Sequence, residues 1–423
     1  MQTLREKASL FFSDWTLVRR VVFVLAAIFI FRALASIPIP GVNLDALAQL
    51  FSQNQFFGIL NIFAGGGLSN LSIVLLGVGP YITASIIMQL MTIIFPKLKA
   101  MYQEEGEAGR IRFAQYSRLL TLPLAVLQGI AFLVILTRQG IVPSLPPFEF
   151  AVNVGIVTAG SMLLMWLGEL ISEFGIGQGV SMLIFAGIVS RLPSTVSQLI
   201  FTFDASQLPV YIAFVAVAVV TIAGVVVVSE AERPIPVTYA KRVRGMRVMG
   251  GGTTYLPFRL NQAGVIPIIF ALSILLLPQM AFGLLAGSDS ARLVKFASDA
   301  VALLNNHWVY GTSYFVLVFI FTYFYTAVTF DPNQVAQNLQ RDGAFIPGVR
   351  PGASTADYLA KVVTRITLPG ALFLGVIAVL PIVMQGLTGI NTLAIGGTAL
   401  LIVVSVVLDL VRRIDAQLAI REY

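Results

Sequence analysis

The sequence predicts an all-α polytopic membrane protein with ten transmembrane helices, on three observations. Hydrophobic residues make up 57% of the 423 residues and charged residues 11%, whereas soluble domains average roughly 45–50% and about 25%. Ten apolar segments approach the ~20 residues that cross a bilayer. Lys and Arg gather in alternate connections between these segments. A soluble multidomain protein is therefore excluded.

The ten apolar segments follow one another along the whole chain. The first runs into Ile37-Pro38-Ile39-Pro40-Gly41 and lacks a small-residue cleavage site, so we interpret it as a span and not as a signal peptide. The predicted spans are 21–37, 77–95, 116–136, 152–171, 179–200, 209–229, 262–285, 310–330, 366–384 and 393–411.

The connections between the spans differ in character. Residues 38–76 hold no Lys or Arg and contain the loosening glycines 65–67, so we expect this segment to re-enter the protein from outside. The motif Gly175-Ile176-Gly177-Gln178-Gly179 predicts a tight turn between spans four and five. Residues 230–259 and 331–365 are long, basic and rich in turn residues, which predicts protruding cytoplasmic loops.

The distribution of basic residues predicts the orientation. Twenty-two of the 27 Lys and Arg residues lie in the terminal segments and the loops on the same side, against three in the opposite loops. The positive-inside rule therefore places both termini in the cytoplasm. The formal charge of +7 reflects this bias and does not indicate nucleic-acid binding. On the opposite side, 286–310 has the composition of a polar external loop.

Few residues are suited to catalysis. The chain has no Cys and a single His, His307, which excludes thiolate chemistry, Cys-ligated metals and an HExxH site. We therefore expect no enzyme activity, no metal and no cofactor. Glu169 and Asp409 lie at span ends, where pairing or snorkelling is expected, and no carboxylate lies at mid-membrane, which weighs against ion-coupled transport. Snorkelling or capping is also expected for Arg32 and Arg191.

Eight groups of motifs, in order along the chain, resemble the bacterial SecY family, the channel subunit of the general protein translocon. They are Phe31-Arg32 with 37–41, 63–69 (Phe-Ala-Gly-Gly-Gly-Leu-Ser), 79–90 (starting Gly-Pro-Tyr-Ile-Thr-Ala-Ser), 165–169 with 175–181, Tyr239-Ala240-Lys241-Arg242, 261–267, 343–352 and 396–404.

The resemblance implies a fold of two inverted five-span halves, 1–205 and 206–423, around a central pore. It implies a channel that passes unfolded preproteins across the membrane and releases hydrophobic segments sideways into it. A small-solute uniporter built on inverted repeats is the alternative, and an intramembrane enzyme is a second. The implied pore ring, for which lipid or core packing is the other interpretation, consists of Val78, Ile82, Val180, Ile184, Ile269 and Ile402.

Two further elements follow from the resemblance. The re-entrant segment at about 62–75 would be a plug, unless it is a structured external loop; its key residues are Ile62, Phe63, Gly65, Gly66, Gly67, Leu68, Ser69 and Leu71. Spans two, three, seven and eight would form a lateral gate. Polar residues that would bond across this gate, or simply hold the helices together, are Thr83, Ser85, Gln128 and Asn261.

The cytoplasmic loops would dock the SecA motor ATPase or the ribosome through Lys241, Arg242, Arg244, Arg247 and Arg350. The other interpretation is that these residues set the topology and touch anionic lipids. The resemblance also implies small SecE-like and SecG-like membrane subunits, preproteins with signal sequences as substrates, no direct DNA binding, and residence in the bacterial plasma (inner) membrane.

Overall fold

The chain folds into a mostly helical molecule in the computed structural model. The structure describes residues 14–39, 71–138, 142–143, 145–190, 192–193, 197, 201, 208–239, 242–244, 247–249, 252–285, 291–388 and 396–421. Up to residue 205 the helices are α2 (Trp15–Ala35), α5 (Gly79–Ile94), α6 (Pro96–Gln103), α7 (Gly106–Arg138), α8 (Pro147–Phe174) and α9 (Gly179–Val189).

The second part of the chain adds helices and a small amount of sheet. Its helices are α11 (Leu208–Glu230), α12 (Ile266–Leu285), α13 (Ala291–Asn305), α14 (His307–Thr329), α15 (Pro332–Arg341), α16 (Ala353–Thr388) and α18 (Gly396–Arg421). Its strands are β1 (Glu232–Tyr239), β2 (Arg242–Arg244), β3 (Arg247–Met249), β4 (Thr253–Arg259) and β5 (Ala344–Phe345).

Each of the ten predicted spans overlaps a helix of the structure. Within the described part of the chain, five helices are long and apolar enough to cross a bilayer, namely α7, α8, α11, α14 and α16. A sixth is added if α5 and α6, which are bent by 113° at Phe95-Pro96, count as one span. Proline at the start of α6 cannot continue the ladder of α5, which explains the bend. The ten-span count therefore stays a prediction.

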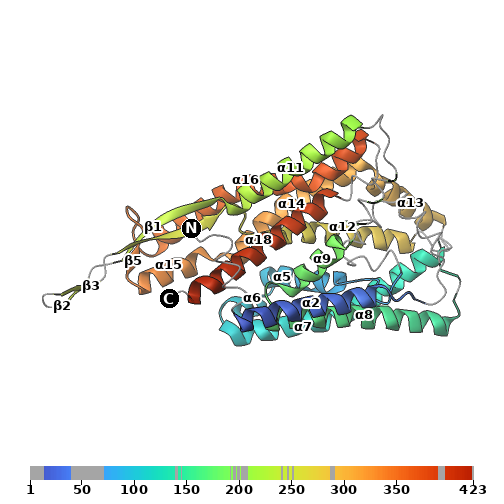
Figure 1. The fold of residues 1–423 in the computed structure, drawn as a ribbon, viewed down its shortest axis with the longest axis horizontal. Coiled ribbons are helices and arrows are strands. Elements are labelled where there is room, and N and C mark those ends of the chain that lie inside the picture. The colour runs from blue at the N-terminus through green and yellow to red at the C-terminus, as the bar shows by residue number, and fades with distance from the viewer. Residues whose placement is uncertain are drawn as a thin grey trace.

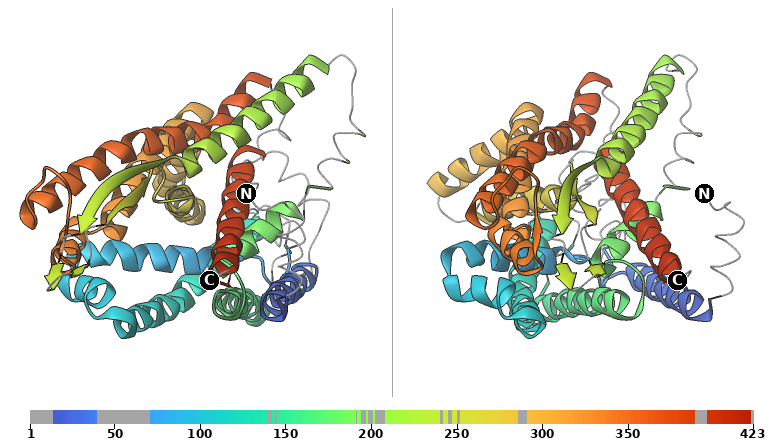
Figure 2. Two further views of the ribbon diagram at one scale, coloured as in Figure 1. Left: turned by 60° about the vertical axis from the view of Figure 1, so that its left-hand side comes forward. Right: turned by 90° about the vertical axis from the view of Figure 1, so that its left-hand side faces the viewer.

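The two parts of the chain lie on either side of the molecule. In Figures 1 and 2 the helices up to residue 205, coloured blue to green, gather on one side, and α11, α14 and α16 lie on the other. Helices α9, α12 and α18 lie nearest the boundary (Figure 1). One hydrophobic cluster joins these three helices to α2, α5, α8, α14 and α16.

Apolar side chains also cover the outer surface. On α11, the side chains of Val215, Val219, Val220 and Val227 are all exposed. Monomeric soluble proteins rarely expose apolar patches of this extent, so this surface fits contact with lipid or with other membrane helices.

The two segments expected to be cytoplasmic loops are folded, which corrects the sequence prediction. Strands β4, β1 and β5 form an antiparallel sheet in that order, so the segment before residue 260 pairs with the segment after residue 331. Buried Ile235 and Val237 alternate with exposed neighbours along β1 and pack with Leu359 and Val363 of α16. The sheet is therefore held by its own small core.

The segment predicted to be an external loop, 286–310, contains a helix in its described part. Residues 291–305 form helix α13, which packs against α12 and α14 and carries the exposed side chains of Leu293, Phe296 and Leu303. The prediction of an ordinary polar loop was therefore wrong, because the apolar residues of this segment recur at helical spacing.

Candidate functional site

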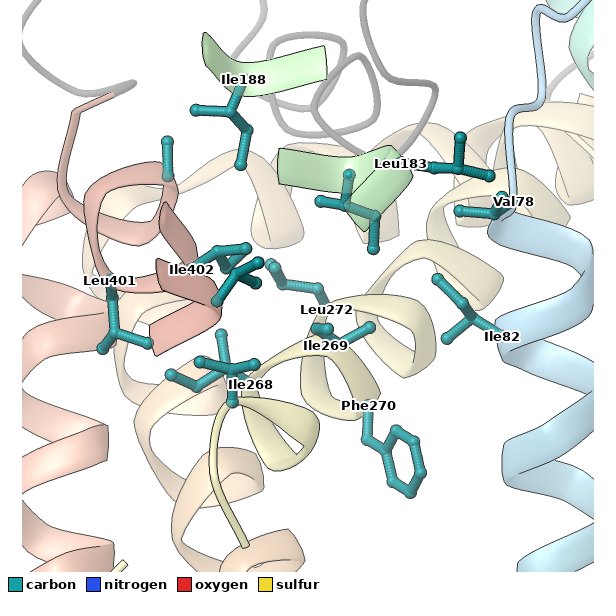
Figure 3. Close-up of a cluster of buried hydrophobic side chains, with 14 of the residues drawn as sticks. Val78, Ile82, Leu183, Ile188, Ile268, Ile269, Phe270, Leu272, Leu401 and Ile402 are labelled. Carbon is teal, nitrogen blue, oxygen red and sulfur yellow. The ribbon is translucent and has the colours of Figure 1, made fainter. Parts of the chain in front are cut away.

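The six positions of the expected pore ring lie in or against one hydrophobic cluster of the structure. Val78 and Ile82 lie at the start of α5, Ile184 on α9, Ile269 on α12 and Ile402 on α18; each is at most 7% exposed. All five belong to the main hydrophobic cluster, and half-buried Val180 packs against it. Figure 3 shows Val78, Ile82, Ile269 and Ile402 pointing toward one region between the helices.

The close approach of α8 and α9 positions two of these side chains. The turn between the helices uses Gly177 at φ +91°, a conformation that favours glycine. A Cβ atom at Gly179 would lie 1.7 Å from the carbonyl oxygen of Gly168, so only glycine fits there. The Ser172 hydroxyl accepts a 2.8 Å hydrogen bond from the Gly179 N–H. The predicted tight turn is thereby confirmed, and it begins the helix that carries Val180 and Ile184.

A cavity of about 330 Å³, lined by both polar and apolar residues, adjoins the main hydrophobic cluster. Its walls are the start of α9, residues 261–266 before α12, and α18 from Ser405 to Arg413. Three residues, Met182, Val265 and Val406, belong both to this cavity and to the hydrophobic cluster. The cavity therefore ends directly on the cluster.

The plug prediction falls largely outside the described residues. Of its named residues, Ile62, Phe63, Gly65, Gly66, Gly67, Leu68 and Ser69 lie there, and only Leu71 is described. Leu71 is buried, its carbonyl accepts from the Ile39 N–H at 2.8 Å, and the Ile73 N–H donates to Ile37 at 3.0 Å. The C-terminal end of the segment is thus anchored to the residues that follow α2.

The helices of the expected lateral gate are in contact: α12 packs against both α5 and α7, and against α14. Two of the four polar residues named for the gate, Thr83 and Asn261, form local hydrogen bonds instead of bonds across it. The Thr83 hydroxyl donates to the Gly79 carbonyl of its own helix (3.0 Å), and the Asn261 side-chain amide donates to Gly264 (3.2 Å). Ser85 and Gln128 are half-buried and form no hydrogen bond with another described residue.

One long-range hydrogen bond connects a gate helix, α14, to α6, the short helix between gate helices α5 and α7, and it was not predicted from the sequence. The side-chain amide of Gln103, at the end of α6, donates to the carbonyl of Val328 near the end of α14 (3.2 Å). A cavity beside this bond is lined by Tyr102 and Arg110 from one part of the chain and by Asp331 from the other. Because the two partners are 225 residues apart, no local pattern indicates this bond.

Four of the five basic residues named for docking lie in described segments, Arg350 after β5 and Arg242, Arg244 and Arg247 on β2 and β3. Arg350 is exposed in the turn that links β5 to α16, and its carbonyl accepts from the Thr355 hydroxyl (2.8 Å). Residues 242–244 and 247–249 form a hairpin whose register pairs Arg244 with Arg247 and Arg242 with Met249. Lys241 lies outside the described residues. Figure 1 shows the hairpin at the far end of the molecule from α13.

Charged residues at the span ends are paired, as expected. Glu169 at the end of α8 accepts from the Arg118 guanidinium of α7. Asp409 pairs with Arg413 one turn further along α18, at 2.8 Å. Within the described residues, no group of three or more His, Cys, Asp or Glu side chains is arranged to hold a metal ion. Arg191 lies outside the described residues.

Leu272 is a further aliphatic residue that the sequence analysis missed. It is buried and lies beside Ile269 in Figure 3. Its spacing of three residues from Ile269 puts it on the same face of α12, and this spacing was the available signal.

A comparison with protein families and curated proteins gives consistent matches. A family model described as SecY matches residues 72–411. The chain is similar to the protein translocase subunits SecY of Thermotoga maritima, with 42% identity over 96% of this chain and 93% of that protein, and of Mycobacterium tuberculosis, with 41% identity over 96% of both.

Solved structures with similar folds are channels. A structure described as that of a protein conducting channel superposes with a TM-score of 0.67 at 18% identity, covering 96% of this chain and 93% of that one. A structure of SecY described by its plug domain and the closed state of the channel superposes with a TM-score of 0.65 at 18% sequence identity, and the coverage of both chains is the same. Sec61 in a canine ribosome-channel complex superposes with a TM-score of 0.63 at 17% sequence identity, covering 96% of this chain and 93% of that one.

Proposed function

The chain belongs to the SecY family of protein translocase subunits, and on this basis we propose that it is the channel through which unfolded preproteins cross a bacterial plasma membrane. The observation that carries the proposal is that the six expected ring positions, on or at the start of α5, α9, α12 and α18, lie in or against one hydrophobic cluster, which a cavity of mixed polar and apolar lining adjoins. An apolar constriction excludes ions by dewetting. Aliphatic side chains also separate around a peptide without leaving polar groups unsatisfied.

The proposed pore ring consists of Val78, Ile82, Val180, Ile184, Ile269 and Ile402. In the idle channel these side chains pack together, which accounts for their burial. During transport they would part around the chain. The two sides of the clamshell would be residues 1–205 and 206–423, related as inverted halves.

The contact of α12 with α5 and α7 supports a lateral exit for hydrophobic segments. Few bonds hold this gate in the described residues, and the Gln103 bond to Val328 is of modest strength, about 0.5–1.5 kcal/mol. A gate of this kind reopens easily. Signal sequences and membrane segments would leave between these helices.

The segment at 62–75 would close the external side of the pore as a plug. The anchored residues 71–73 would serve as its fixed end, and the glycines at 65–67 would ease its movement. The fold likeness to a SecY channel described by its plug domain supports this assignment.

The cytoplasmic sheet and its hairpin would bind the SecA motor or the ribosome. Exposed Arg350 and the arginines of the hairpin supply positive charge, which suits ribosomal RNA and acidic protein surfaces. The fold likeness to Sec61 in a ribosome-channel complex supports a ribosome partner.

SecE-like and SecG-like subunits and anionic lipids would complete the assembly, with both termini in the cytoplasm. The chain would have no catalytic activity, so the energy would come from its partners.

Reconstitution tests the proposal. The chain, purified with its small membrane subunits and placed in proteoliposomes, should protect an added preprotein from protease when the motor ATPase and ATP are present. Equal protection in vesicles that lack this chain would overturn the proposed function.

The alternative function, a small-solute uniporter, is not supported by the relatives, which are translocase subunits.

A further inference from the structure

Three arginines line the cavity that adjoins the main hydrophobic cluster. Arg259 comes from the end of β4, and Arg412 and Arg413 come from α18. The cavity is lined by residues of α9, α12 and α18, the helices that carry Val180, Ile184, Ile269 and Ile402. A chain that entered the ring through this cavity would meet the three arginines, and free guanidinium groups would bind its acidic segments. Whether these arginines are free or paired with carboxylates therefore affects which preprotein sequences can pass.

Each of the three guanidinium groups is held by a carboxylate. Arg259 Nε lies 3.1 Å from Glu232 Oε1, and these two residues are direct partners across the β1–β4 ladder. Arg413 Nε lies 2.8 Å from Asp409 Oδ2, four residues earlier on the same helix. This order, with the acid toward the N-terminus, is the favourable one for such a pair.

Arg412 has the most extensive contacts. Its Nη2 lies 2.6 Å and its Nε 3.0 Å from Glu230 Oε1, and Nη2 also donates to the Ser229 carbonyl at 2.7 Å. This carbonyl belongs to the last turn of α11, where backbone oxygens lack helical partners. Arg412 therefore joins α18 to the end of α11 while its charge is neutralised by Glu230.

These pairs account for every charged side chain that lines this cavity in the described part of the chain. Their side chains keep 28–51% of their surface exposed, so a passing chain can reach them. A paired charge acts at a distance as a dipole, whose field falls off faster than that of a single charge. The lining itself holds the three arginines and Asp409, and the partners Glu230 and Glu232, which do not line the cavity, balance the two remaining positive charges.

We propose that Glu230, Glu232 and Asp409 are specificity-determining residues: they neutralise the arginines of the cavity, so that acidic and basic segments of a preprotein pass equally well. This inference rests on the proposed function. Without the carboxylates, the three arginines would retain acidic segments and repel basic ones.

The test uses the complete channel complex in proteoliposomes and three preproteins that differ in one short insert of Glu-Gly, Lys-Gly or Ser-Gly repeats. In the triple variant Glu230→Gln, Glu232→Gln, Asp409→Asn, the transport rate of the acidic insert relative to the neutral one should fall about threefold, the effect of an exposed ion pair of ordinary strength. In the opposite variant, Arg259→Gln, Arg412→Gln, Arg413→Gln, the basic insert should be slowed instead.

The control is Glu105→Gln, which breaks a 3.7 Å pair with Arg112 that does not line this cavity; it should leave all three rates unchanged. Glu232→Gln alone, a milder change, should shift the acidic-to-neutral ratio in the same direction. Equal slowing of all three inserts in both triple variants would overturn the inference and assign the pairs a purely structural role. Failure of the unaltered channel to transport the neutral insert would instead contradict the proposed function.

Discussion

The glycines between α8 and α9 set the position of part of the pore ring. Gly179 lies against the Gly168 carbonyl, and Gly177 adopts a left-handed conformation. Since α9 starts at Gly179, any displacement here moves Val180 and Ile184 relative to Ile269 and Ile402. A single glycine next to Val180 would therefore influence the proposed seal.

We expect Gly179→Ala to destabilise the channel by about 1–3 kcal/mol, because the added methyl group overlaps the Gly168 carbonyl and the helices must separate. The thermal stability of the purified complex measures this loss. Gly155→Ala on α8 is the matched control, since a Cβ there meets no atom within 4 Å. Equal stability of the two variants would contradict the packing argument.

The roles of individual residues were predictable from the sequence where a local pattern existed. The spacing of the glycines predicted the turn, and the positions of Glu169 and Asp409 at span ends predicted their ion pairs. The bonds of Thr83 and Asn261 were not predictable, because a hydroxyl or amide is satisfied equally well by a local carbonyl as by one on a neighbouring helix.

Among the elements, the sheet of β4, β1 and β5 was the least predictable. Pro234 and Pro236 lie within β1, and proline argues against a central strand. Its partner β5 has only two residues and comes from a distant segment. The helical spans were predictable because an apolar run of about 20 residues has few alternatives in a membrane.

The sheet gives Arg350 a fixed place next to β5. We expect Arg350→Glu to weaken motor-driven preprotein transport severalfold, because a charge reversal opposes docking of an acidic partner surface, while insertion of the channel itself stays normal. The comparison is Arg292→Glu, the same charge change at an exposed site on α13, at the other end of the molecule. Normal transport by the Arg350 variant would remove this residue from the docking surface.

The hydrogen bond between α6 and α14 is expected to restrain opening of the gate. Gln103→Ala should ease opening of the gate, because one hydrogen bond of about 0.5–1.5 kcal/mol is lost. Preproteins with defective signal sequences should then be transported roughly two- to tenfold faster. Gln128→Ala, which removes no hydrogen bond with a described residue, is the control. An unchanged rate in the Gln103 variant would show that this bond does not restrain the gate.

For the whole molecule, the plug and the pore ring would close the idle channel at two different places. Deletion of residues 63–70 would remove the plug but keep the anchored Leu71 and Ser72. We expect higher resting ion conductance of channels in planar bilayers, because the external closure is lost while the aliphatic cluster remains. Replacement of the same residues by a Gly-Ser linker of equal length controls for the shortened connection and should also leak. Unchanged conductance in both would identify the segment as an ordinary external loop.

Whether a translocating chain touches the ring is the central question for the whole molecule. Photocrosslinking side chains at Ile82, Ile184 and Ile402 should each form adducts with a preprotein stalled in transit. The same group at Val407, an exposed position one and a half turns along α18 from Ile402, should label other membrane components instead. Adducts with the stalled chain from Val407 and none from the three ring positions would contradict the account.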